Sequence, residues 1–230
     1  MLSYRKLAMR VLGRPLHTGG GNDSPRPASQ RAAAFILTAA MLTTLTAPAF
    51  AKTWDIEEGD ITVKAGKTEG TNMVSQGEQK DVEDTGTVIT GKSDKNTVTI
   101  EAEKEDDKVE VTLKDLNIDA SRGSEAAVSV TGKGDTNIEL DGDNELKSGA
   151  GHAGLEHNKT DTSGELTIQD KDKNGSLEAV GGFKGAGIGS AGSNDAQVKI
   201  TGGNITATSD DWGAGIGSGS DGTAYVEITG

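Results

Sequence analysis

An internal repeat of 28 residues constrains this chain more than any other feature of its sequence. The string GAGIGS occupies residues 185–190 and returns 28 positions later at 213–218. The string VKITGG at 198–203 is followed at the same interval by VEITG, which begins at Val226. Two separate motifs in one register indicate repeated structural units, which bury their apolar faces by stacking on their neighbours.

Weaker copies of the repeat extend upstream. Within each unit, three short runs alternate apolar and polar residues, and Gly, Asp, Asn and Ser separate the runs. Alternation with period two is typical of β-strands, and three strands per unit are typical of one β-helix coil. The sequence therefore predicts an all-β fold, a parallel right-handed β-helix solenoid with coils of about 28 residues. An antiparallel sandwich is the alternative. The units start, at spacings of 27, 28, 32 and 28 residues, at Val111, Ile138, Leu166, Val198 and Val226.

The first 51 residues have the pattern of an export signal. Six basic residues precede an apolar stretch at 32–47, and Ala49-Phe50-Ala51 supplies a cleavage pattern of small residues. The apolar stretch is shorter than the ~20 residues of a membrane-spanning helix. We predict a signal peptide at 1–51 and a mature chain that begins at Lys52, with an uncleaved anchor as the alternative. The protein is then expected to be secreted or held at a bacterial cell surface.

Two regions follow the predicted leader. Residues 52–110 are less regular and are expected to form an N-terminal capping β region, in which 55–63 is predicted as a hairpin. Residues 111–230 hold the β-helix repeats. The sequence stops inside a fresh repeat element, so we expect the repeats to be truncated, with further coils and a cell-wall anchor beyond them.

The charge of the mature part excludes some classes of partner. Six of the 23 basic residues and one of the 36 acidic residues precede Lys52, which leaves 17 against 35 and a net charge of −18. Such a surface repels nucleic acid and anionic lipid, so neither nucleic acid nor a membrane is expected as a partner after signal cleavage. The chain has no cysteine, so stability must come from backbone pairing or metal ions.

The strings from Trp54 to Val63, GAGIGS and ITGG together resemble those of Gram-positive secreted carbohydrate-binding-domain-containing or adhesin-like β-helix surface proteins. The stretch from Val111 to Ile118 is similar to clostridial β-helix domains that bind acidic polysaccharide with calcium. The resemblance covers nearly all of 54–230 and implies a surface location and a polysaccharide or host glycan as partner. It assigns no site residue.

One segment has the pattern of a calcium loop. Oxygen-bearing side chains at Asp170, Asp172 and Asn174 precede a glycine, and Glu178 supplies a further carboxylate. A tight turn brings alternate side chains around one hard cation, so calcium is the predicted metal. Asp, Asn and Gly are also ordinary turn residues, and a plain solvated turn is the alternative.

The mature part has few aromatic residues, and two of them precede a GAGIGS string. Phe183 and Trp212 are candidates for a carbohydrate-binding platform, since sugars stack on aromatic rings. They lie 29 residues apart, so packing at the rim is the alternative. His152 and His157 are five residues apart and are predicted as exposed loop histidines without a metal.

No catalytic constellation emerges from the sequence. Hydrolysis of glycosides needs paired carboxylates at a fixed separation, and no pair stands out among the scattered acidic residues. Arg122 is the single arginine of the mature part and has no cluster around it. We therefore predict a non-catalytic extracellular carbohydrate-binding or adhesin-like module, assisted by calcium. A purely structural surface stalk is the first alternative, and a polysaccharide lyase or hydrolase is the second.

Overall fold

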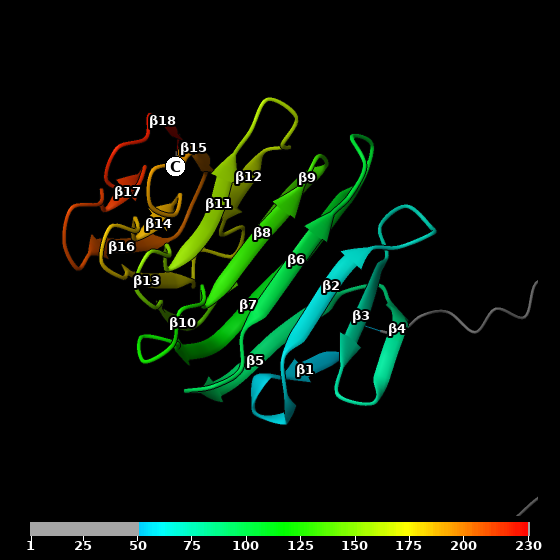
Figure 1. Ribbon diagram of the computed structural model, residues 1–230. Helices are drawn as coiled ribbons and strands as arrows, with labels where there is room; N and C mark the ends of the chain where they lie inside the picture. Colours follow the sequence, from blue (N-terminus) through cyan, green and yellow to red (C-terminus); the bar gives the residue numbers. More distant parts are fainter. Residues whose placement is uncertain (1–50, 230) are drawn as a thin grey trace, which may run out of the picture. The chain divides into compact units, whose positions relative to one another are not determined.

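The computed structural model describes residues 51–229, and it is a parallel β-solenoid of about five turns (Figure 1). The β-helix with coils of about 28 residues is thereby confirmed. The predicted signal peptide lies outside the described residues, apart from Ala51. The coils build three walls, and each wall is a stack of parallel strands from successive coils.

The first wall runs the length of the solenoid. Its strands are β1 (Thr53–Asp55), β5 (Thr87–Ser93), β7 (Lys108–Asp119), β9 (Asp135–Asp141), β12 (Leu166–Gln169), β15 (Asp195–Ile200) and β18 (Ala224–Ile228). The second wall comprises the last residues of β5 and β7, then β10 (Asp143–Lys147), β13 (Ser176–Gly181) and β16 (Asn204–Ser209). The third comprises β2 (Ile61–Ala65), β6 (Val98–Ala102), β8 (Val128–Gly132), β11 (Leu155–Lys159), β14 (Ile188–Gly189) and β17 (Ile216–Gly217).

Inward-facing residues stack in aligned ladders and form the core. In the third wall, one ladder is at most 1 % exposed over five coils. Burying one such side chain contributes about 1.5–3 kcal/mol, so each ladder stabilises several coils together. The residues of this ladder are Ile61, Val98, Val128, Leu155 and Ile188.

One predicted alignment of the repeats is wrong by two residues. Ile138 pairs with Ile168, not with Leu166, and Leu166 pairs with Thr136. A shift of two residues keeps every side chain on its own face of the strand, so alternation alone does not fix the register. The buried Thr136 takes the place of an apolar residue in its ladder, and this polar residue conceals the true start of the unit.

The hairpin predicted at 55–63 is also wrong. Asp55 caps a short 3-10 helix, η1 (Ile56–Glu58), by accepting a hydrogen bond from the N–H of Glu57, and β1 and β2 then pair in parallel with β5 and β6. Antiparallel pairing occurs instead further on, where β3 (Asn72–Gln76) joins β2 to β4 (Gln79–Asp84) beside the first coil (Figure 1).

The glycines of the GAGIGS strings are required by the close approach of successive coils. Gly189 and Gly217 hold the same position in adjacent coils and have φ angles of +133° and +140°. Residues with a side chain rarely adopt such φ angles. A Cβ atom on Gly189 would lie 1.9 Å from the carbonyl oxygen of Gly217. Glycine in these strings therefore serves coil stacking.

We expect Gly189→Ala to destabilise the fold by about 2–4 kcal/mol, because it combines backbone strain with a clash against fixed backbone. Urea unfolding followed by circular dichroism measures this change. Gly123→Ala is the matched control, since its new Cβ would meet its nearest neighbour, the carbonyl oxygen of Ala120, at 3.4 Å. The control is expected to stay within about 0.5 kcal/mol of the parent protein. Equal losses in the two variants would contradict the stacking argument.

Candidate functional site

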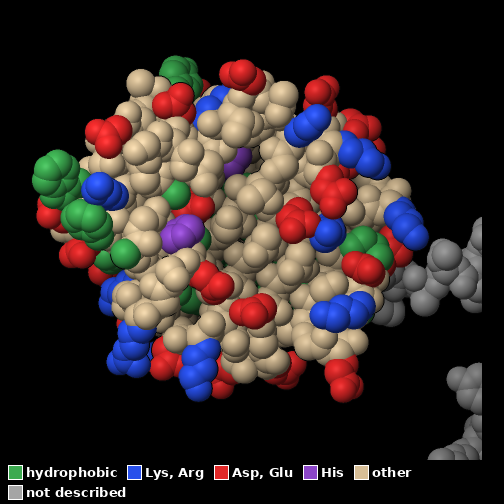
Figure 2. Space-filling view, viewed as in Figure 1, with side chains coloured by type: hydrophobic (Ala, Val, Ile, Leu, Met, Phe, Trp, Pro, Cys, Tyr) green, Lys and Arg blue, Asp and Glu red, His purple; other side chains and the backbone are tan. Residues whose placement is uncertain are grey.

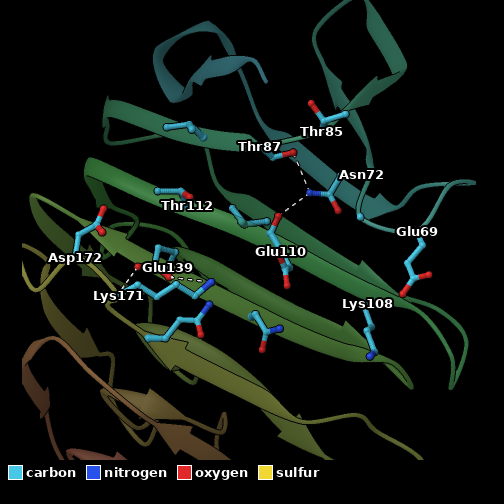
Figure 3. A pocket seen from close by; sticks show the side chains of 16 residues that line it. Glu69, Asn72, Thr85, Thr87, Lys108, Glu110, Thr112, Glu139, Lys171 and Asp172 are labelled. Atoms are coloured by element: carbon cyan, nitrogen blue, oxygen red, sulfur yellow. Dashed lines mark hydrogen bonds and ion pairs between the residues drawn. The ribbon is translucent and has the colours of Figure 1, made fainter. Parts of the chain in front are cut away.

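A groove with a volume of about 610 Å³ lies on the outer face of the first wall (Figure 3). Its floor consists of outward-facing side chains from four consecutive strands, β5, β7, β9 and β12. Glu69, just before β3, lies at one end of the groove, and the loop after β12 with Lys171 and Asp172 lies at the other. The groove therefore spans several coils rather than one loop.

Strand register arranges the floor in rows. One row places Val88, Thr112, Glu139 and Gln169 side by side, and the neighbouring row contains Glu110 and Asn137. Adjacent strands are about 4.8 Å apart, so each row offers a polar group at nearly every step of that length. Hydroxyl, amide and carboxylate groups alternate, and the floor can both donate and accept hydrogen bonds.

Hydrogen bonds hold both ends of the groove in place. The Nδ2 of Asn72 donates to the Oγ1 of Thr87 at 2.9 Å and to the carbonyl oxygen of Glu110 at 2.7 Å (Figure 3). At the other end, the backbone N–H of Lys171 donates to the Oε1 of Glu139 at 2.6 Å, and its Nζ lies 3.7 Å from the Oε2. These contacts fix β3 and the loop after β12 against the coils, so the groove is preformed.

The groove has an excess of negative charge. Its lining contains two lysines, Lys108 and Lys171, and four acidic side chains. A neutral, hydroxyl-rich ligand suits such a lining, whereas an acidic ligand needs a cation to offset the repulsion. The acidic residues are Glu69, Glu110, Glu139 and Asp172.

Two residues of the predicted calcium loop, Asp170 and Asn174, are engaged in a turn. The Oδ1 of Asp170 accepts the N–H of Asn174 at 3.2 Å, and its Oδ2 accepts the N–H of Gly175 at 3.1 Å. Asp172 is exposed at the edge of the groove, and Glu178 faces outward from β13. Within residues 51–229, no three histidine or acidic side chains converge as a metal-binding group. Calcium binding by Asp170, Asp172, Asn174 and Glu178 stays a prediction.

The two predicted platform residues lie in loops of adjacent coils. Phe183 is 44 % exposed between β13 and β14, and Trp212 is 70 % exposed between β16 and β17. Figure 2 shows hydrophobic side chains gathered at this edge. Gly181 pairs with Ser209, so the coil equivalent of Trp212 is Lys184, and these two residues have φ angles of +68° and +69°. The rings are therefore offset by one position, and carbohydrate binding by them stays a prediction.

The prediction of two exposed loop histidines is wrong for His157. It is 2 % exposed and points inward from β11, in the ladder of Ile100 and Val130. Its Nδ1 lies 3.3 Å from the carbonyl oxygen of Val130 and its Nε2 lies 3.0 Å from that of Gly164. Burial lowers the pKa of His157 below its ordinary 6.5. Here the last paired position of the ladder is a polar side chain, which the spacing of apolar residues does not reveal.

His152 is partly buried and has a carboxylate partner. Its Nδ1 lies 2.8 Å from the Oε2 of Glu156, which is buried. The same oxygen accepts the N–H of Ala153 at 3.1 Å, and the Nδ2 of Asn158 donates to the Oε1 at 3.0 Å. Three donors therefore satisfy the buried carboxylate, and His152 is one of them. This network fixes the loop between β10 and β11.

The groove itself is absent from the sequence prediction. Its lining comes from residues that are far apart in sequence and meet only through the register of the first wall, such as Glu110, Asn137 and Gln169. The available signal is that most outward positions of these strands are polar. Recognising it requires the register, which the sequence places wrongly between β9 and β12.

The comparisons with known proteins support the repeat and leave the ligand open. A family model described as beta helix repeat matches residues 198–220. The search of curated proteins and the search of solved structures give no match. No helix in the described part of the chain is long and apolar enough to cross a membrane.

We expect the stability of the protein to fall as the pH drops below about 6.5, because of His157. Its pKa is lowered in the folded protein, so between the folded and unfolded pKa values the unfolded chain binds more protons, and protonation favours unfolding. The loss is expected to reach at most about 1.4 kcal/mol per pH unit. Urea unfolding between pH 7.5 and 5.5 measures it.

The replacement His157→Leu should flatten this profile, and His152→Gln is the control that should keep it. The carboxyl groups of Asp119, Glu145 and Asp195 have lowered pKa values and titrate below this pH window. If His157→Leu lost as much stability between pH 7.5 and 5.5 as the parent protein does, the pH dependence would not come from His157.

Proposed function

We propose that this protein is a non-catalytic, extracellular carbohydrate-binding or adhesin-like module of a bacterial surface, and that the groove on the first wall holds an extended glycan. The β-helix repeat provides a rigid scaffold. The observation that carries the proposal is the polar floor of the groove, which repeats with the coils and is preformed at both ends.

An extended polymer with hydroxyl groups along its length matches such a floor. Rows of Thr112, Glu139 and Gln169, with Asn137 beside them, present donors and acceptors at steps of about 4.8 Å. Each hydrogen bond contributes only about 0.5–1.5 kcal/mol, so affinity comes from engaging several coils at once. A compact small molecule would reach too few of these groups.

The charges of the groove favour a neutral polysaccharide or host glycan. Four carboxylates against two ammonium groups repel an acidic polymer unless a divalent cation bridges the two. Calcium is the cation that the sequence predicts, and Asp172 belongs both to the predicted calcium loop and to the groove. Calcium is therefore proposed to assist binding of acidic glycans alone.

Binding without chemistry is supported by the way in which the groove is built. Glu139 is already engaged by the backbone N–H and the ammonium group of Lys171, and Asn72 is engaged by Thr87 and the backbone. These side chains serve to shape the groove. The exposed rings of Phe183 and Trp212 offer a second contact surface for sugars on the same solenoid.

The paired replacement Asn137→Ala and Gln169→Ala is expected to weaken glycan retention about tenfold, since it removes two hydrogen-bonding groups from the floor. Affinity electrophoresis of the secreted protein in gels that contain neutral plant or host polysaccharides measures the effect. Thr99→Ala with Ser129→Ala is the matched control, because these polar residues face outward from the third wall. The control should be retained like the parent protein.

Acidic polysaccharides form the second arm of the same experiment. Retention is expected with calcium and is expected to be lost with a chelator, whereas retention on neutral polymers should be unaffected. No retention of the folded protein on any polymer would favour the structural stalk. Release of reducing or unsaturated ends would favour a lyase or hydrolase.

A further inference from the structure

The carboxylate of Asp84 is buried at the end of β4 and is surrounded by N–H donors. The residue is 0 % exposed. Its Oδ1 accepts the backbone N–H of Lys52 at 3.0 Å and that of Gly86 at 3.2 Å, and its Oδ2 accepts the indole N–H of Trp54 at 2.8 Å. As long as Lys52 is joined to Ala51 by a peptide bond, these three N–H donors, which lie within residues 51–229, are all neutral groups. A buried carboxylate with neutral partners alone retains much of its desolvation cost.

Lys52 is held in place by contacts other than the one to Asp84. Its carbonyl oxygen accepts the N–H of Val88 at 3.2 Å, which adds it to the first wall ahead of β1. Its Nζ donates to the Oε1 of Gln79 at 2.5 Å and lies 3.6 Å from the ring centroid of Trp54. The position of the Lys52 nitrogen is therefore set by the fold and does not depend on its own hydrogen bond.

The pattern Ala49-Phe50-Ala51 places the predicted cleavage immediately before this nitrogen. We propose that removal of the leader creates an ion pair between the new α-ammonium group of Lys52 and the buried carboxylate of Asp84. Hydrolysis of the Ala51–Lys52 peptide bond by water leaves a carboxylate on Ala51 and an amine on Lys52, and the amine takes up a proton. The inference rests on the export step of the proposed function, but not on glycan binding.

Because the ion pair forms only after the leader is removed, it stabilises the first coil in the mature chain and not in the precursor. In the precursor, the Lys52 nitrogen is an amide and contributes a neutral hydrogen bond. In the mature chain, it supplies a positive charge at a site that is shielded from solvent on the Asp84 side, where attraction is stronger than at an exposed surface. Asp84 also bonds to Trp54 and pairs across from Asn72, so the charge stabilises the junction of β1, β3 and β4.

A double-mutant cycle on the exported full-length protein tests the pair. The first change inserts Gly-Ser between Ala51 and Lys52, which displaces the α-amino group and leaves an amide at Lys52. The second change is Asp84→Asn. N-terminal sequencing of the secreted parent protein is expected to give Lys52 as the first residue. The insertion should lower the melting temperature by about 2–4 °C with Asp84 present and by less than about 1 °C in the Asp84→Asn background.

A chemical measurement covers the case in which Asp84→Asn does not fold. Acylation of the α-amino group at neutral pH is expected to be about tenfold slower in the parent protein than in the insertion variant, since the pair holds the amine in its protonated form. A first residue other than Lys52, equal melting shifts in the two backgrounds, or equal acylation rates would overturn the inference. Failure of the parent protein to bind any glycan would affect the proposed function alone.

Discussion

The backbone hydrogen bonds between successive coils determine the rest of this structure. They place each strand about 4.8 Å from its equivalents in the coils above and below. At some positions, the backbone of one coil then lies so close to that of the next that no Cβ atom fits between them. Gly189 and Gly217 occupy such positions, and a Cβ on the first would lie 1.9 Å from the backbone of the second. The glycine-rich strings are therefore a consequence of stacking.

The same spacing decides which residues meet. Inward residues meet their own equivalents, so the core is a set of mostly apolar ladders, some of which include a buried polar member. Thr136 lies between Val109 and Leu166 in its ladder, whereas His157 follows Ile100 and Val130 at the end of its own. Outward residues meet in the same way. The groove arises because several consecutive coils present polar side chains on the first wall, and because β3 and the loop after β12 close its two ends.

The sequence predicts the parts of this fold that depend on period and fails where register or burial of polar groups decides. The alternating runs and the GAGIGS strings are sufficient for the parallel β-helix and for the third-wall ladder through Ile188 and Ile216. The step from Ile138 to Ile168 is misplaced, because a shift of two residues leaves the alternation unchanged. The groove depends on that register. Asp172 is the one predicted site residue that also lines it.

The register of the first-wall strands also bears on whether the groove would favour a short ligand or a long one. A groove floor built from one or two polar side chains per coil gives a weak contact at each step, of about 0.5–1.5 kcal/mol, and no single residue dominates. A ligand that crosses one coil gains too little to offset the loss of its own freedom, whereas a polymer that crosses four strands adds the contacts of all four. Because hydrogen bonds already hold both ends of the groove, the proposed polymer would bear most of the ordering cost. For the extended glycan that we propose as the ligand, length and regular spacing would therefore matter before the chemistry of any one sugar.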